Sequence, residues 1–362
     1  MTSFNIENFI KDSVRELKAY KVNEVDQHKK ALKLDANESN YILGKNIKKK
    51  YADYIKDTLI NLYPDPNSKN LLGSIQKFYG FSTNNFIFGN GSDELISIIL
   101  LSLKKDVTVN IPSPSFSMYE IIAKYNDLNA KIIKLNDENF DLPDNIALID
   151  DKKLKNLYFF SYPNNPTGNH FNRKIIYGLL ENKNNLVVVD EAYIFFSDEK
   201  SFLNELTKYE NLIVLKTFSK IGLAGLRFGM LFSGDKLIDE FKKIKLPYNI
   251  NSLTLSSIEF FLKNFDEFEK NIKKTVKQRK VLYKKLSALP FIKVYNSDAN
   301  FLLIKLKDKK NKIKFDNFLN ENNIIIRSFT GIMDLYYRIT VGTEKENKKL
   351  TDYFIEFSKG LS

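Results

Sequence analysis

Short apolar runs and longer stretches with helical periodicity alternate along most of this chain. Within the helical stretches apolar residues recur every three to four positions, as in Leu95, Ile98, Ile99 and Leu101. Apolar runs of strand length lie at residues 86–88, 107–111, 131–135, 157–160, 186–189 and 212–215. This alternation predicts an α/β fold, with a three-layer large domain in which helices cover both faces of a mostly parallel sheet.

The pattern changes after the last of these runs. A long helical stretch covers residues 253–289, and shorter apolar runs follow at 292–294, 301–304 and 338–341. We therefore expect a smaller α+β C-terminal domain. The predicted division is an N-terminal arm at 1–31 that packs with the small domain or a partner subunit, a large domain at 32–252 and a small domain at 253–362.

Composition narrows the function classes. The 362 residues suffice for two domains, and the chain has no cysteine, which excludes disulfides and thiolate metal sites. Its two histidines, His28 and His170, do not make a metal cluster by themselves, so no metal is expected. The first residues are amphipathic and charged, and no apolar run approaches membrane-spanning length. We expect a soluble protein with no membrane partner, compatible with a reducing cytoplasm.

The formal net charge of +12 raises the question of nucleic-acid binding. The lysines, however, are spread along the chain, as at 48–50, 242–243 and 309–310, and no nucleic-acid motif or aromatic platform accompanies them. We expect no nucleic-acid partner; the charge instead favours attraction of phosphorylated metabolites.

Four motifs follow predicted strands. They read GNGSDE at 89–94, SYPNNPTG at 161–168, DEAY at 190–193 and TFSKIGLAGLRFG at 217–229. Ligands of parallel sheets bind at the carboxyl ends of the strands, where these motifs place Asn165, Asp190 and Lys220. A (β/α)8 barrel also binds ligands there, but the order of the motifs disfavours it.

In this order the motifs resemble those of fold-type I pyridoxal-phosphate-dependent aminotransferases, and are most similar to those of histidinol-phosphate aminotransferases. The resemblance runs from about residue 20 to 343 and also includes LDANES, YPDP, LPYNINSLT, ANF and RITVGT. It implies a pyridoxal 5'-phosphate cofactor, whose aldehyde Lys220 would bind covalently. The freed amine would then act as general base and acid.

The resemblance assigns further side chains to the cofactor ring. Asp190 follows a strand that reads as buried on both faces, and would pair with the protonated pyridine nitrogen. A helix N-cap is the alternative role for an aspartate at this place. Tyr193 and Asn165 would hydrogen-bond the phenolic oxygen. Phe116 would stack on the ring, where relatives commonly have tyrosine.

The cofactor phosphate is expected at the start of a helix. Backbone amides at Gly91, Ser92 and Asp93 would bind it, because glycine permits close approach of the backbone. Ser219 and Arg227 supply further phosphate contacts in the family. Tyr63 resembles the tyrosine that reaches the phosphate of the neighbouring subunit, which implies a homodimer.

Substrate recognition is expected from a second set of residues. Arg338 matches the arginine that binds the substrate's carboxylate or phosphate, and an arginine on an apolar strand needs an anionic partner if it is buried. Arg327, Tyr20 and Asn37 match other family positions that contact substrate.

Three departures from the family pattern concern the site. Arg227 follows Lys220 by seven positions, one fewer than is common in the family. The loop that binds the phosphate is therefore expected to differ in conformation from that of relatives. The usual NENP reads NESN at 37–40, and Phe116 replaces tyrosine. These changes affect the substrate end more than the cofactor chemistry.

The expected reaction is transfer of an amino group from glutamate to a small phosphorylated carbonyl compound, or the reverse, with histidinol phosphate and 2-oxoglutarate as the first candidate pair. A transaminase of another phosphorylated ketone, such as dihydroxyacetone phosphate, is the second candidate. A threonine-phosphate-decarboxylase-like enzyme is the third. A non-catalytic pyridoxal-phosphate sensor is the fourth candidate. Sensors of this kind, in some transcription regulators, carry an added DNA-binding domain, and we expect the residues before Tyr20 to be too few for one.

Overall fold

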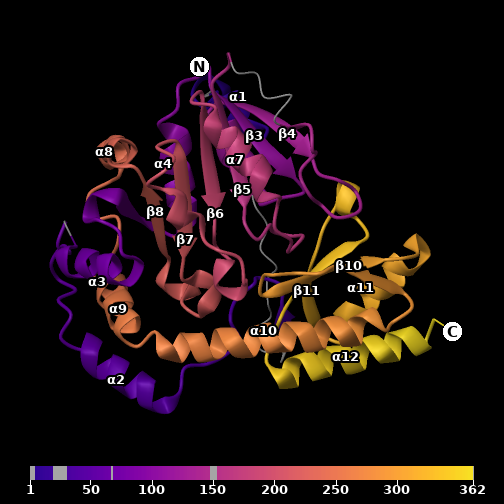
Figure 1. The fold of residues 1–362 in the computed structure, drawn as a ribbon. Coiled ribbons are helices and arrows are strands. Elements are labelled where there is room, and N and C mark those ends of the chain that lie inside the picture. The colour runs from indigo at the N-terminus through magenta and orange to yellow at the C-terminus, as the bar shows by residue number, and fades with distance from the viewer. Residues whose placement is uncertain (1–4, 19–30, 67, 147–152, 362) are drawn as a thin grey trace.

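The computed structural model describes residues 5–18, 31–66, 68–146 and 153–361, and contains two sheets (Figure 1). The larger has seven strands in the order β2-β8-β7-β6-β5-β3-β4. These are β2 (Phe86–Asn90), β3 (Thr108–Ser113), β4 (Asn129–Lys134), β5 (Asn156–Ser161), β6 (Asn185–Asp190), β7 (Leu212–Thr217) and β8 (Phe228–Ser233). All six strands expected in this part of the chain are confirmed.

One strand of this sheet was not expected. β8 begins directly after Arg227 and pairs antiparallel with both β2 and β7, whereas the pairs from β7 to β4 are parallel. Its apolar run follows the lysine motif so closely that it reads as part of the motif. The sheet is therefore mostly parallel, with one inserted antiparallel strand.

Helices cover both faces of this sheet, as predicted. The strand residues Val187 and Val189 pack on one face and Val188 on the other, and all three are fully buried. One face carries α3 (Lys69–Tyr79), α7 (Arg173–Glu181) and α9 (Ser252–Lys263). The other carries α4 (Ser92–Leu101), α5 (Met118–Tyr125) and α8 (Asp235–Ile244).

The second sheet has five strands in the order β1-β11-β12-β10-β9. Its strands are β1 (Leu32–Leu34), β9 (Ile292–Val294), β10 (Phe301–Leu306), β11 (Ile324–Ser328) and β12 (Tyr336–Thr340). It packs on α10 (Asp266–Ser287), α11 (Lys312–Glu321) and α12 (Glu344–Lys359). The expected α+β architecture of the C-terminal part is confirmed.

Two details correct the predicted division of the chain. Leu32 and Leu34 are buried in the core of the five-stranded sheet, where β1 pairs parallel with β11, so residues 32–34 do not belong with the larger sheet. The helical stretch 253–289 is two helices: α9 packs on α3 and α2 (Lys45–Ile55), and α10 then runs along the bottom of the view in Figure 1 to the smaller sheet. The larger sheet with its helices and the smaller sheet with its helices are therefore not separated at residue 252. The boundary of an independently folding domain stays a prediction.

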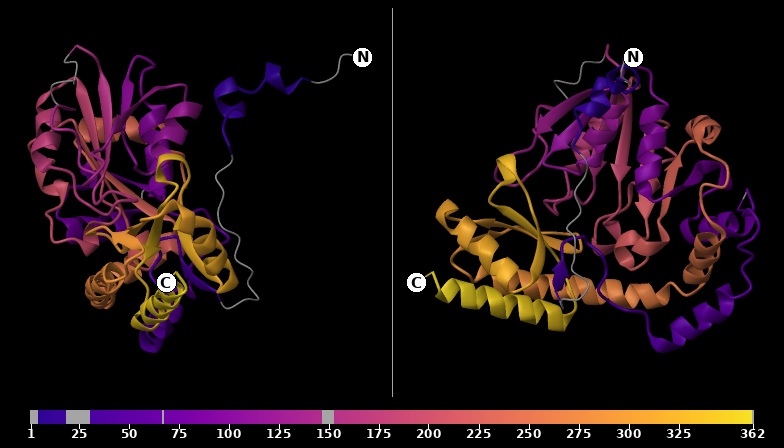
Figure 2. Two further views of the ribbon diagram at one scale, coloured as in Figure 1. Left: turned by 90° about the vertical axis from the view of Figure 1, so that its right-hand side faces the viewer. Right: turned by 180° about the vertical axis from the view of Figure 1, so that it is seen from behind.

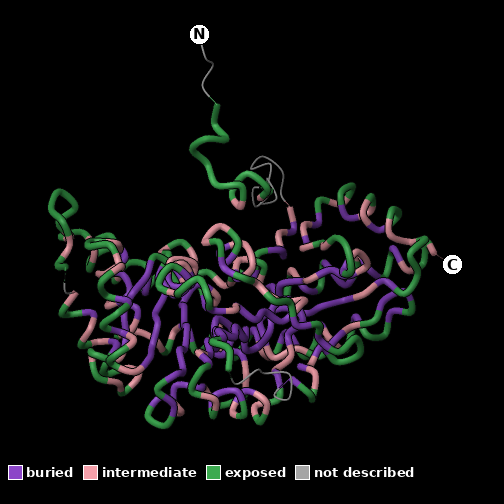
Figure 3. Tube along the Cα trace, turned by 90° about the horizontal axis from the view of Figure 1, so that it is seen from above, coloured by how far each residue is buried: buried purple, intermediate pink, exposed green. Residues whose placement is uncertain are grey.

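The described part of the N-terminal arm contacts the turn after α5, a helix that packs on the larger sheet. Lys11 Nζ and Ser13 Oγ each lie 2.6 Å from a carboxylate oxygen of Asp127, in the turn after α5, whereas we expected contacts with the small domain. Residues 5–18, which include α1 (Asp12–Arg15), are mostly exposed and project away from the rest of the chain (Figures 2 and 3). Contact of the arm with a partner subunit stays a prediction. Among the described residues, no helix has the length and apolar character needed to cross a membrane.

Candidate active site

A cavity of about 360 Å³ lies where the carboxyl ends of the central parallel strands face the five-stranded sheet. Seven of the side chains singled out in the sequence line it, namely Asn37, Phe116, Asn165, Tyr193, Lys220, Arg327 and Arg338. They come from segments up to 338 − 37 = 301 positions apart in sequence, which is the strongest structural support for a common site.

Lys220 extends from the turn after β7. Thr217, the last residue of that strand, accepts a hydrogen bond from the backbone N–H of Ser219 at 3.1 Å, and this bond orders the short 3-10 turn Ser219–Ile221. Lys220 is partly buried, and its Nζ lies 5.8 Å from the centroid of the Tyr193 ring. The amine therefore stands on the wall of the cavity beside a second predicted residue.

Asp190 ends β6 and is only 4% exposed. Its Oδ2 accepts a hydrogen bond from the Tyr119 hydroxyl at 2.7 Å, and its Oδ1 accepts one from the Ala192 N–H at 3.0 Å. Burial raises the pKa of this carboxyl from 3.8 to about 6, against the opposing effect of the two hydrogen bonds. The N-cap of the following 3-10 helix is Tyr193, so the alternative helix-capping role does not apply to Asp190.

Two hydrogen bonds orient the groups expected at the phenolic oxygen of the cofactor. Asn37 donates from Nδ2 to the Tyr193 hydroxyl oxygen at 2.9 Å, which directs the tyrosine's own proton elsewhere. Arg338 donates from Nη1 to Oδ1 of Asn165 at 2.5 Å, so the NH₂ of that amide is the end left to donate. Asn37 thus lines the cavity as expected, and it also fixes Tyr193.

The residues expected to bind phosphate are brought together at the start of α4. Arg227 Nη2 lies 2.9 Å from Asp93 Oδ2, and a Cβ added to Gly91, whose φ is +78°, would lie 2.5 Å from that same nitrogen. Ser92 begins the helix, so its backbone N–H is one of those left without a partner within the helix. Ser219 Oγ lies 2.8 Å from Thr217 Oγ1, on the strand that pairs with β8.

The loop between Lys220 and Arg227, whose conformation we expected to differ from that of relatives, consists of two short 3-10 turns. Gly222 separates them with φ +122°, and Arg227 itself has φ +49°, a left-handed conformation that is rare for arginine. This backbone conformation helps turn the guanidinium toward the start of α4.

These observations test whether the site fits the expected cofactor. Among the described residues, the buried carboxylate of Asp190 has no cation within 4.0 Å, and a protonated ring nitrogen would supply one. The partly buried Phe116 ring lines the cavity and is placed to stack on a planar ligand. The amine and the ring platform line the cavity. Asp190, Gly91, Ser92, Asp93, Ser219 and Arg227 lie outside its lining, but the Asp190 carboxylate is within electrostatic reach of both Lys220 and Asp93. This set of groups fits pyridoxal phosphate.

The remaining expected residues differ in outcome. Arg327 lies opposite Arg338 in the register of β11 and β12, and both line the cavity. Tyr63 is 81% exposed and stacks on Tyr248 at 4.7 Å, outside the cavity lining of this single chain. Tyr20 lies outside the described residues.

The sequence analysis missed two groups that contact these side chains. Tyr119 bonds Asp190, and the backbone carbonyl of Asp35 accepts a 2.6 Å hydrogen bond from Arg338 Nη2. Tyr119 follows Phe116 by three positions, one helical turn on, and that spacing is the only signal that could have indicated it. A backbone carbonyl leaves no sequence signal.

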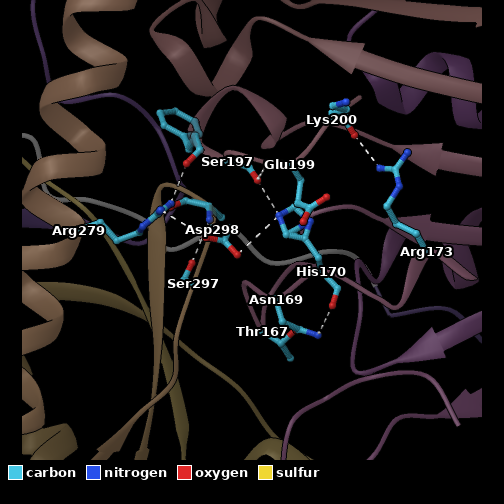
Figure 4. A network of polar contacts seen from close by, with 12 residues as sticks. Thr167, Asn169, His170, Arg173, Ser197, Glu199, Lys200, Arg279, Ser297 and Asp298 are labelled. Carbon is cyan, nitrogen blue, oxygen red and sulfur yellow. Dashed lines mark hydrogen bonds and ion pairs between the residues drawn. The ribbon is translucent and has the colours of Figure 1, made fainter. Parts of the chain in front are cut away.

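The segment that follows Asn165 takes part in a network of polar contacts, in which His170 contacts Ser197 and Asp298 (Figure 4). The N–H of Asp298 donates to Gly168 O at 2.7 Å, and a Cβ at Gly168 would lie only 2.4 Å from Ser297 Oγ. Arg279 donates from Nη1 to the carbonyls of Phe196 at 3.0 Å and Ala299 at 2.8 Å. These contacts join segments that follow β5 and β6 of the larger sheet to the segment between β9 and β10 of the smaller one.

Comparison with known proteins agrees with this geometry. Residues 29–354 match the family model described as Aminotransferase class I and II. A histidinol-phosphate aminotransferase of Vesicomyosocius okutanii is 36% identical over 97% of this chain and 98% of its own length.

Two solved structures share the fold. That of the histidinol-phosphate aminotransferase from Clostridium acetobutylicum has a TM-score of 0.81 and 26% identity, covering 91% of this chain and 99% of the other. That from Sinorhizobium meliloti, in complex with pyridoxal-5'-phosphate, has a TM-score of 0.86 and 20% identity over 98% of both chains.

The predicted fold class and the predicted kind of enzyme are both confirmed by these comparisons. Since the family model spans most of the sequence and a relative of 36% identity is covered almost end to end, the chain belongs to the class I and II aminotransferase family.

Proposed function

We propose that this protein is a pyridoxal-phosphate-dependent aminotransferase that moves an amino group between glutamate and 2-oxoglutarate on one side and histidinol phosphate and its keto counterpart on the other. The observation that carries the proposal is the single cavity shared by Lys220 and the two arginines of the smaller sheet, with the Asp190 carboxylate behind it. The names of the relatives support the substrate.

The side chains divide the work of cofactor binding. Lys220 would hold the aldehyde carbon covalently, Asp190 would pair with the ring nitrogen, and Tyr193 and Asn165 would donate to the phenolic oxygen; Lys220, Tyr193 and Asn165 line the cavity. The amides at the start of α4, with Ser219 and Arg227, bind the phosphate. When bound, pyridoxal phosphate withdraws electrons from the substrate's α-carbon.

Proton transfer falls to Lys220. With the cofactor bound, the Nζ of Lys220, freed by the substrate amine, would take the proton from the substrate's α-carbon and give it to the carbon that was the aldehyde. Its partial burial and the closeness of Tyr193 keep the amine in the cavity. One base would therefore serve both directions of the reaction.

Arg338 is assigned to bind the anionic group of the substrate. Its bonds to Asn165 and to the Asp35 carbonyl fix the plane of the guanidinium at the cavity wall, and Arg327 faces it across the β11–β12 register. Two guanidinium groups at one cavity, of which that of Arg338 is fixed by hydrogen bonds, suit carboxylate and phosphate oxygens.

Arg338→Ala is expected to raise KM for both anionic substrates tenfold or more. A hydrogen bond to a charged group contributes on the order of 1.5 to 3 kcal/mol, which corresponds to that change. Steady-state kinetics with glutamate and with histidinol phosphate measure it. Unchanged KM values for both substrates would show that another residue binds the anion.

The proposal is tested by spectroscopy on the purified protein with cofactor. Glutamate alone should convert the absorbance band of the lysine-bound cofactor into the pyridoxamine phosphate spectrum, and the keto acid should restore it. A decarboxylase or a sensor would not complete this half-reaction. A panel of phosphorylated substrates, including dihydroxyacetone phosphate and threonine phosphate, then separates histidinol phosphate from the alternatives.

A homodimer is part of the proposal. The segment that carries Tyr63 exposes Ile60, which is 77% exposed, and Leu62, and it lies beside Tyr248 and the exposed Leu253. A patch of this kind on one face favours burial against a second copy of the chain. The arm exposes further apolar side chains at Ile6, Phe9, Ile10 and Val14.

We place the protein in the cytoplasm, which agrees with the lack of cysteine.

Tyr63→Phe is expected to weaken cofactor binding about tenfold, because the hydroxyl would donate to the phosphate bound by the neighbouring subunit. Equilibrium titration of the cofactor-free protein measures the affinity, and light scattering measures the molar mass. A monomer that binds the cofactor with unchanged affinity in the variant would contradict both the dimer and this role for Tyr63.

A further inference from the structure

A tyrosine outside the expected set makes a direct contact with the cofactor machinery. Tyr119 lies in α5, fully buried, and its hydroxyl donates to Asp190 Oδ2 at 2.7 Å. Among the described residues, no other side chain hydrogen-bonds this carboxylate. The contact joins a helix on one face of the larger sheet to the end of its central strand β6.

Packing leaves the Tyr119 ring little freedom. It stacks on Phe159 of β5 with centroids 4.5 Å apart and an angle of 7° between the ring planes. Phe116, the expected platform for the cofactor ring, meets it edge-on at 5.4 Å and 86°. Since both contacts fix the plane of the ring, they also fix the line along which the hydroxyl points to Asp190.

The surroundings of Asp190 show what this hydroxyl contributes. The carboxylate receives two hydrogen bonds, from Tyr119 and from the backbone of Ala192. Of the charged groups that act on it, Asp93 opposes its ionisation and Lys220 favours it. Burial is the largest influence and favours the neutral acid, so each donor matters for keeping the charge.

We propose that Tyr119 is a positioning residue that holds the Asp190 carboxylate ionised and aimed at the ring nitrogen of the cofactor. The inference rests on the proposed function. A donor to Oδ2 stabilises the anion and fixes the rotation of the carboxylate group about its bond to Cβ. Without this donor the proton shared with the cofactor would move toward the carboxylate, and the ring nitrogen facing it toward its neutral form.

The chain provides a matched control. Tyr79 is a partly buried tyrosine whose buried hydroxyl has no hydrogen-bond partner among the described residues, and its ring packs on the opposite face of the larger sheet. Tyr119→Phe and Tyr79→Phe therefore each remove a buried hydroxyl oxygen, and only the first removes a donor to Asp190. A third variant carries 3-fluorotyrosine at position 119, which keeps the ring and makes its hydroxyl a stronger donor.

The first measurement uses the cofactor-free protein. Carbon-13 NMR follows the titration of the Asp190 carboxyl, assigned by its loss in Asp190→Asn. In Tyr119→Phe the midpoint should rise by about one pH unit or more, as expected for the loss of a hydrogen bond to a charged group. It should fall with 3-fluorotyrosine and stay unchanged in Tyr79→Phe.

The second measurement uses the protein loaded with cofactor labelled with nitrogen-15 in the ring. The wild type and Tyr79→Phe should show the chemical shift of a protonated ring nitrogen, and Tyr119→Phe a shift toward the neutral form. An unchanged Asp190 midpoint and an unchanged nitrogen shift in Tyr119→Phe would overturn the inference alone. Absence of any borohydride-reducible band in the wild type would instead overturn the proposed function.

Discussion

Lys220→Ala is expected to lower kcat by about 10³-fold or more, because the variant loses both the covalent attachment of the cofactor and the general base, and a positioned base alone contributes about 10² to 10⁴-fold. The wild type loaded with cofactor should show an absorbance band near the visible edge that borohydride abolishes, and digestion should then recover the cofactor on the peptide containing Lys220. In the variant borohydride should leave the protein unlabelled.

The chain has 56 lysines and arginines, so labelling of an unrelated amine has to be distinguished. Lys236→Ala is a suitable control, since that side chain is 85% exposed and lies outside the cavity lining. It should leave both the band and kcat as in the wild type. A reducible band of normal intensity in Lys220→Ala would refute the assignment of this lysine.

The fold could be predicted where the burial of an element alone determines its pattern of apolar residues. Strands such as β6 are buried on both faces, so they read as continuous apolar runs, and the helices between them show the period of one buried face. β1, β8 and β11 were not predicted. β1 and β11 pair with each other across almost 300 positions of sequence, and β8 pairs antiparallel within a sheet whose other pairs are parallel, so these strands depend on partners that a local pattern does not show.

The site was predictable to the extent that its chemistry requires a particular residue type. A covalent amine and an acid for the ring nitrogen leave few choices, so Lys220 and Asp190 stand out at the ends of two strands. Tyr119 and the bond from Arg338 to Asn165 do not, because neither position requires one residue type and the contacts span 71 and 173 positions. Such contacts follow from packing of the finished fold, which a motif does not encode.

Asp190→Asn is expected to lower kcat of the cofactor-loaded enzyme by about 10²-fold or more, since removing one partner of a buried ion pair costs about 3 to 5 kcal/mol. The same substitution should change the stability of the cofactor-free protein in a pH-dependent way. Burial raises the pKa of Asp190 to about 6 in the folded chain, from an ordinary value of 3.8. Between these values the folded state binds more protons than the unfolded state, so this group's contribution to stability falls as pH rises from 4 to 6 and stays low above that.

Denaturant unfolding at several pH values measures this contribution as the difference in unfolding free energy between wild type and Asp190→Asn. From pH 4 to pH 7 the unfolding free energy of the wild type should fall by about 3 kcal/mol relative to that of Asp190→Asn, the equivalent of about two pKa units. Asp12→Asn, at a side chain that is 84% exposed, should show no comparable change. Saturating cofactor should remove the effect, because a cationic ring nitrogen favours the ionised carboxylate. If the difference is independent of pH without cofactor, Asp190 is not the buried, unpaired acid that a pyridinium partner would require.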